Sequence, residues 1–199
     1  MTAVTEQQPV DLDTIEDIRV TQENRLTPQQ IARGLAFHEA AHAVIGMAAG
    51  MPLVRTRIVR TTQDGRPVLS GATAWAPNSA QPFDFAVMSL AGQTADLRQL
   101  AEAGLLTAQT AAWADSAHDR HLATTGLATI GYEIRPSGPA PAYGTTWAAV
   151  ADEAERRVTA LWPQITAVAQ AMLTAANETV TAAEAEALTG IPNPAPYQH

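Results

Sequence analysis

The segment His38-Glu39-Ala40-Ala41-His42 contains residue types whose spacing could do chemistry. On a helix, two histidines four residues apart lie on the same face, so both imidazole rings can bind one metal ion. Zinc held by two imidazoles and a carboxylate keeps a position for water and lowers the pKa of that water towards about 7. Glu39 would accept the proton and later pass it to the leaving amine. The pattern predicts zinc-dependent peptide hydrolysis, with His38 and His42 as zinc ligands and Glu39 as the catalytic base.

The third zinc ligand must come from a distant part of the chain. A third histidine six residues after the second, as in one group of zinc proteases, is excluded because position 48 is Ala48. A glutamate on the following helix is excluded as the third ligand because no glutamate occurs between Glu39 and Glu102. A cysteine ligand is excluded because the chain has no cysteine. Residues 115–124 supply four candidates: Asp115, His118, Asp119 and His121.

Three segments together resemble the peptidase domain of the FtsH-type ATP-dependent zinc proteases. They are the HEAAH segment, Leu90-Ala91-Gly92-Gln93-Thr94-Ala95-Asp96, and Ser116-Ala117-His118-Asp119 with Ala123-Thr124 in register. The order and rough spacing agree with those of the family, although Asp96 stands where the family has a glutamate. The resemblance implies a zincin-like fold and makes Asp119 the third zinc ligand.

His118 and His121 remain alternatives to Asp119 as the third ligand. On a helix, His118 points about 100° away from Asp119, so the two cannot bind one metal equally well. Asp115 lies one turn earlier, where we expect either a hydrogen-bond partner of the site or a solvated carboxylate.

We expect no ATPase domain of the kind that FtsH-type proteases use to unfold their substrates. No GxxxxGK[ST] phosphate-binding segment is present, and the remaining residues are too few for an ATPase domain. We therefore expect a polypeptide substrate that is already flexible or unfolded, unless a separate ATPase or a homo-oligomer assists.

Composition and charge narrow the classes of partner. The formal net charge is −8 and no run of lysine or arginine could follow a phosphate backbone, so no nucleic-acid partner is expected. Residues 1–22 lack the pattern of a signal peptide. The most apolar stretch, residues 34–54, contains three ionisable side chains, which are costly in a bilayer. We expect a cytoplasmic protein with no membrane partner.

The elements predicted around these residues form a mainly α, α+β fold. Helices are expected at residues 28–50, 83–106, 108–130 and 145–176, the last kinked or divided at Pro163, with a short one from Thr181. Strands at 53–62 and 68–75 predict a hairpin, and residues 134–144 predict a loop. The domain boundaries follow: a flexible N-terminal arm at 1–26, a zinc peptidase-like domain at 27–190, and an irregular tail at 191–199.

Two other functions are compatible with the sequence. An exposed strand edge of the hairpin can accept an extended peptide by backbone pairing, so the chain could be a catalytically silent peptidase fold that acts as a protein-binding module. The alternative is that other parts of the chain cover this strand edge, so that it binds no peptide. The motif could also be accidental in a purely structural helical protein.

Overall fold

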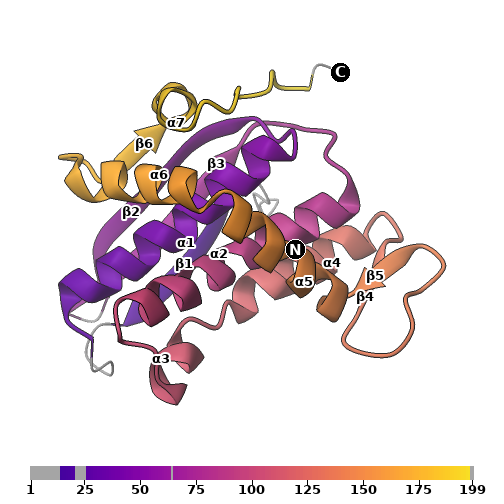
Figure 1. Ribbon diagram of the computed structural model, residues 1–199, viewed down its shortest axis with the longest axis horizontal. Helices are drawn as coiled ribbons and strands as arrows, with labels where there is room; N and C mark the ends of the chain where they lie inside the picture. Colours follow the sequence, from indigo (N-terminus) through magenta and orange to yellow (C-terminus); the bar gives the residue numbers. More distant parts are fainter. Residues whose placement is uncertain (1–13, 21–25, 64, 198–199) are drawn as a thin grey trace, which may run out of the picture.

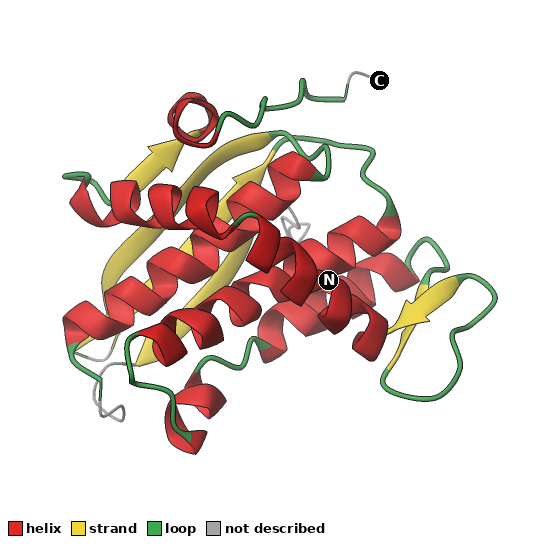
Figure 2. Cartoon of the chain, viewed as in Figure 1, coloured by secondary structure: helices red, strands yellow, loops and turns green. Residues whose placement is uncertain are grey.

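The computed structural model describes residues 14–20, 26–63 and 65–197, and for residues 14–20 it describes the backbone. The fold is α+β: helices pack on one face of a small sheet, as Figure 1 and Figure 2 show. The described helices are α1 (Pro28–Ala48), α2 (Pro82–Glu102), α3 (Ala108–Trp113), α4 (Ala117–Ala128), α5 (Trp147–Ala160), α6 (Trp162–Thr174) and α7 (Ala182–Thr189).

The main sheet is antiparallel and contains the predicted hairpin. Its strand order is β1-β3-β2-β6. The strands are β1 (Thr14–Val20), β2 (Leu53–Gln63), β3 (Arg66–Trp75) and β6 (Thr179–Thr181). A bulge at Val54 separates the pairs Leu53↔Trp75 and Arg55↔Ala74. The bulge changes the alternation of β2, so that Val54 is exposed while Leu53, Thr56 and Ile58 are buried.

Helix α1 is the central helix and begins where the sequence predicts. Thr27 and Gln30 form a capping box, and Pro28 occupies the first turn. Nearly every residue from Ile31 to Met47 is buried, because α2, α6 and the sheet surround the helix. An alanine-rich helix suits this position, since its small side chains let several elements approach closely. The histidines of α1 are therefore held on a rigid, fully packed element.

The predicted division of the C-terminal helix at Pro163 is confirmed. Helix α5 ends at Ala160, and α6 begins at Trp162 with the proline in its first turn.

The prediction of one helix over 108–130 is wrong. Two helices form instead, α3 and α4, separated by residues 114–116. Ser116 occupies the N-cap of α4. Aspartate and serine have low helix propensities, which is consistent with a break at Asp115 and Ser116.

The predicted loop at 134–144 also contains regular structure. Strands β4 (Glu133–Arg135) and β5 (Gly144–Thr146) pair in parallel at its two ends. In Figure 1 this two-stranded sheet projects beside α4 and α5. These two strands are short and lie at the ends of a proline-rich and glycine-rich segment. Their pairing produces no alternation of apolar and polar residues, so the sequence pattern did not predict it.

The two ends of the chain lie against the sheet where they are described. Strand β1 belongs to the predicted N-terminal arm and pairs with β3 over its whole length; residues 1–13 and 21–25 of that arm lie outside the described residues. In the tail, the side chain of Asn193 bonds both the N–H and the carbonyl of Leu53, at 2.8 and 3.0 Å. The backbone N–H of Tyr197 donates to the carbonyl of Pro77. Residues 198–199 lie outside the described part.

None of the helices in the described part of the chain combines the length and the apolar character that crossing a bilayer would require.

Candidate active site

Three side chains from two helices converge at one point inside the molecule. His38 and His42 come from successive turns of α1, and Asp119 comes from the first turn of α4. The Nε2 atoms of the two histidines are 3.0 Å apart. Oδ2 of Asp119 lies 3.1 Å from Nε2 of His38 and 3.5 Å from that of His42. All three side chains are buried, and they lie close enough together to hold a metal ion.

The spacing of these ligand atoms suits a small divalent ion. In a tetrahedral zinc site with metal–ligand bonds of 2.0–2.1 Å, neighbouring ligand atoms are about 3.3 Å apart. The three observed separations, 3.0, 3.1 and 3.5 Å, lie within a few tenths of an ångström of that value. Two imidazole nitrogens and one carboxylate are also the ligand types that zinc accepts. The residues present therefore fit the ion.

A backbone carbonyl orients His42 for metal binding. Nδ1 of His42 lies 2.8 Å from the carbonyl oxygen of Met88 on α2. A carbonyl only accepts hydrogen bonds, so Nδ1 carries a proton, and Nε2 is the ring nitrogen left for a metal ion. Nε2 faces His38 and Asp119. The arrangement is the one by which proteins fix the tautomer of a metal-binding histidine.

Asp119 is held as an anion. Burial alone would raise the pKa of its carboxyl, but the contacts with His38 and His42 outweigh burial and hold the pKa well below its usual range. Its second oxygen, Oδ1, has no hydrogen-bond partner among the described residues. A buried carboxylate with a free oxygen beside two imidazoles is the environment expected of a metal ligand.

Glu39 lies next to the cluster and is fixed through one of its oxygens. The hydroxyl of Thr73 on β3 donates to Oε2 of Glu39 at 2.6 Å. The hydroxyl of Thr56 lies 2.9 Å from that of Thr73, and it must be the donor because Thr73 has already given its proton. Oε1 of Glu39 has no hydrogen-bond partner within the described part of the chain. One oxygen is thus held and the other is available.

The environment of Glu39 raises the pKa of its carboxyl group towards neutral pH. Burial raises the pKa of its carboxyl to about 7, and His42, His38 and the hydrogen bond from Thr73 oppose that rise. A general base works best when its pKa lies near the working pH, because it can then both accept and release the proton. The pKa of about 7 that burial gives Glu39 lies in that range.

Thr73→Val is expected to reduce the ionised fraction of Glu39 near neutral pH without removing the metal. Loss of the hydrogen bond to Oε2 removes one of the interactions that lower the pKa of Glu39, so the acidic limb of kcat/KM against pH should shift to higher pH. The pH profile of peptide cleavage, with zinc content measured in parallel, checks this. Thr73→Ser keeps the hydroxyl and should restore the wild-type profile. An unshifted profile in the valine variant would contradict the assigned contact.

Two glycines allow neighbouring elements to approach these residues. A Cβ added to Gly92 on α2 would lie 2.5 Å from Nε2 of His38 and 2.6 Å from Nε2 of His42. A Cβ added to Gly71 on β3 would overlap the carboxyl group of Glu39. Real Cβ contacts of this kind do not occur, so both positions require glycine for packing. Strand β3 and helix α2 therefore enclose the site from two sides.

Gly92→Ala is expected to displace the histidine rings. The added methyl group should lower zinc affinity and cost about 1–3 kcal/mol of unfolding free energy, as overpacking usually does. Gly126→Ala on α4 is the matched control, since its Cβ would meet nothing within 4 Å; it should stabilise the chain by up to about 1 kcal/mol. Thermal unfolding and zinc titration measure both variants. Normal zinc binding by Gly92→Ala would contradict the packing argument.

The other candidate ligands lie away from the cluster. His118 and His121 are exposed on α4, so the structure brings Asp119, and neither histidine, to the histidines of α1. Asp115 is exposed and forms an ion pair with Arg120. Arg120 also donates to the side chain of Gln93 at 2.7 Å, which links α4 to α2 beside Gly92.

Sequence reasoning missed the residues that support the site. Thr73 gave no signal because a threonine in an alternating strand is common. The carbonyl of Met88 carries no side-chain signature at all. Gly92 lies in a segment that the resemblance singled out, but its role in making room for two imidazoles appears only when α1 and α2 are packed together.

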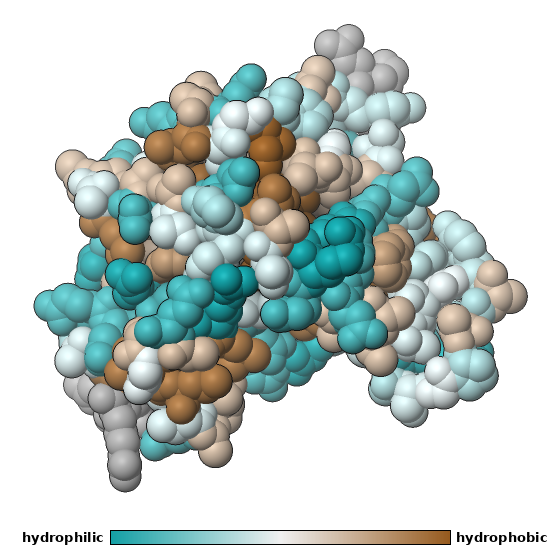
Figure 3. All heavy atoms as spheres, viewed as in Figure 1, coloured by the Kyte–Doolittle hydropathy of each residue, from teal (hydrophilic) through white to brown (hydrophobic). Residues whose placement is uncertain are grey.

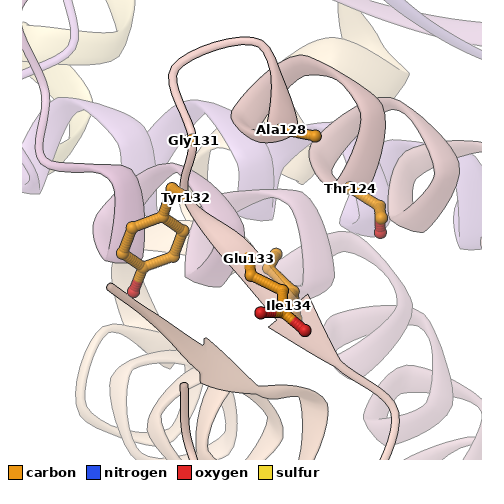
Figure 4. A pocket seen from close by; sticks show the side chains of 6 residues that line it. All are labelled: Thr124, Ala128, Gly131, Tyr132, Glu133 and Ile134. Carbon is orange, nitrogen blue, oxygen red and sulfur yellow. The ribbon is translucent and has the colours of Figure 1, made fainter. Parts of the chain in front are cut away.

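Among the described residues, no second group of histidine and carboxylate side chains lies close enough together to hold a metal ion. In Figure 3, polar side chains form a band across the helix-covered face, between smaller apolar areas. A pocket lies between α4 and β4 and is lined by residues including Thr124, Ala128, Tyr132 and Ile134 (Figure 4). Glu133 is its single carboxylate. The pocket therefore lacks the converging ligands found in the core.

Comparison with known proteins adds no family assignment. The sequence matches no model of a known protein family and shows no significant match to a curated protein. The resemblance to FtsH-type peptidase domains thus stays a prediction, and the candidate site stands on its geometry.

Proposed function

We propose that this chain is a zinc metallopeptidase that hydrolyses peptide bonds in flexible or unfolded polypeptides. One observation carries the proposal: ligand atoms of His38, His42 and Asp119 converge in the core, and the buried carboxyl group of Glu39 interacts electrostatically with all three residues. The order of the motifs along the chain and the α+β fold support a zincin-like peptidase domain similar to that of the FtsH-type proteases.

The residues divide the chemistry of hydrolysis between them. Zinc, when bound by the two histidines and Asp119, supplies a Lewis acid that polarises the scissile carbonyl and lowers the pKa of water. Glu39 accepts a proton from the attacking water through Oε1, while Thr73 keeps Oε2 in place. Glu39 then passes that proton to the nitrogen of the scissile amide as the C–N bond breaks. The products are a carboxylate and an amine.

Removal of the metal provides the direct test of this function. The purified chain should contain about one zinc per molecule and should cleave an unfolded protein such as reduced, alkylated casein. A strong chelator should abolish cleavage, and added zinc should restore it. Protein that contains no zinc and cleaves nothing, even after incubation with zinc, would refute the proposal.

A binding function is the second candidate, and one observation favours it. His38, Glu39, His42 and Asp119 are each 0% exposed, so a substrate does not reach them in the described conformation. A catalytically silent peptidase fold that binds a partner chain would show the same burial. Partner binding at full strength by Glu39→Gln, together with no proteolysis by the wild type, would support this alternative.

A further inference from the structure

Strand β1 runs beside the part of β3 that holds the catalytic base. In the register of the two strands, Ile15 pairs with Thr73 and Asp17 pairs with Gly71. Thr73 donates to Glu39, and Gly71 packs against the carboxyl group of Glu39. Neighbouring strands lie about 4.8 Å apart. The backbone of β1 therefore passes about one strand spacing from the two β3 residues that position the base.

Helix α4 contacts β1 as well. This helix contributes Asp119, and β3 contributes the residues around Glu39, so β1 contacts both elements that flank the candidate active site. The sequence suggested that an edge of the β2–β3 hairpin could bind a peptide. In the structure, β1, a segment of the same chain, covers the β3 edge over the whole length of β1.

We propose that Thr14–Val20 is an internal ligand that occupies the edge of β3 where an extended polypeptide substrate would otherwise pair. An extended segment paired antiparallel with a strand edge is a general way in which proteins bind peptides. Strand β1 has this form, and it lies 7 residues before the cap of α1 at Thr27. The proposal rests on the proposed function, since it makes β1 the competitor of the substrate.

Competition by β1 has a defined effect on affinity. If a site is open for only a fraction of the time, the apparent affinity for its ligand is reduced by that fraction. Release of β1 from β3 should therefore lower KM for a peptide substrate and leave kcat nearly unchanged. Fixing β1 in place should abolish both binding and cleavage.

A reversible covalent lock tests the second consequence in the full chain. The protein has no cysteine, and Ile18 pairs directly with Ser70 on β3. Paired residues on antiparallel strands have Cα atoms about 4.5–5.5 Å apart, which a disulfide can span. The oxidised Ile18→Cys/Ser70→Cys variant should neither cleave casein nor bind peptide, and reduction should restore both. Ser70→Cys alone controls for the reductant, and zinc content is measured in each state. Equal activity of the oxidised and reduced forms would overturn the proposal.

Proline substitutions test release of the strand. Successive N–H groups of an edge strand point alternately towards its neighbour and away from it. Of the two variants Asp17→Pro and Ile18→Pro, one therefore removes an N–H that faces β3, and the other removes an N–H that points away from β3. One variant should lower KM by about tenfold, and the other should resemble the wild type. Unchanged KM in both variants would contradict the proposal.

A binding assay separates this inference from the proposed function. The probe is a fluorescein-labelled peptide with the sequence of residues 12–22, followed by anisotropy. It should bind the proline variant that releases β1 at least about tenfold more tightly than wild type, and it should not bind the oxidised lock. This result would support the role of β1 as an internal ligand even if no form of the chain cleaved casein. Failure of the peptide to bind any form would show that β1 is an ordinary structural strand.

Discussion

Glu39→Gln is expected to reduce kcat/KM for an unfolded substrate by about 10³-fold, within the range that general acid–base catalysis contributes. The glutamine has the same shape and can still accept the hydrogen bond from Thr73, but it cannot take a proton from water. The metal ligands are untouched, so zinc should remain at the wild-type stoichiometry. Cleavage of labelled casein and metal analysis of the same samples measure the two effects together.

The matched control for this variant is Glu155→Gln. Glu155 is exposed on α5 and lies outside the candidate site, so the same chemical change there should leave activity and zinc content unaltered. Activity within tenfold of wild type in Glu39→Gln would remove Glu39 from the role of catalytic base. Loss of zinc in that variant would instead indicate that Glu39 holds the metal.

Asp119→Ala should weaken zinc binding by more than about 100-fold, because loss of a mere supporting partner of a ligand already costs 10–100-fold. Two histidines remain, and they cannot retain the ion at the concentrations used in a purification. Cleavage should be lost with the metal. Competition titration with a chromophoric chelator gives the affinity, and circular dichroism shows whether the helices remain folded.

Three neighbouring substitutions serve as controls for Asp119→Ala. Asp115→Ala, His118→Ala and His121→Ala each remove an exposed side chain from the same segment, and all should bind zinc normally. Asp119→Asn preserves the shape of the side chain and should still lose affinity, since the neutral amide is a poorer ligand. Zinc loss in His118→Ala with retention in Asp119→Ala would make His118 the third ligand.

The proposed role of β1 sets a requirement on a substrate. If the edge of β3 is the edge that binds peptide, an extended substrate has to replace β1 there. We therefore expect cleavage to favour long flexible segments, which can pair with β3 over several residues.

Several features were predictable because they depend on local sequence. The capping box at Thr27 and the proline after it set the start of α1, and the four-residue spacing of His38 and His42 places both rings on one face of that helix. Alternating β-branched residues predicted the hairpin of β2 and β3. Pro163 divided the C-terminal helix because its ring cannot fit inside one. Each of these rules acts within a few residues along the chain.

The completed site depends on contacts between distant segments, and only the tertiary structure decided it. His38 and Asp119 are 81 positions apart, and the rotation of α4 about its axis brings Asp119 to the metal cluster and leaves His118 exposed. Helix α4 begins after a break at residues 114–116, which the sequence pattern did not predict. The pairing of β1 with β3 likewise depends on which edge the folded sheet offers. The sequence determined which residues could do chemistry, and packing decided which of them meet.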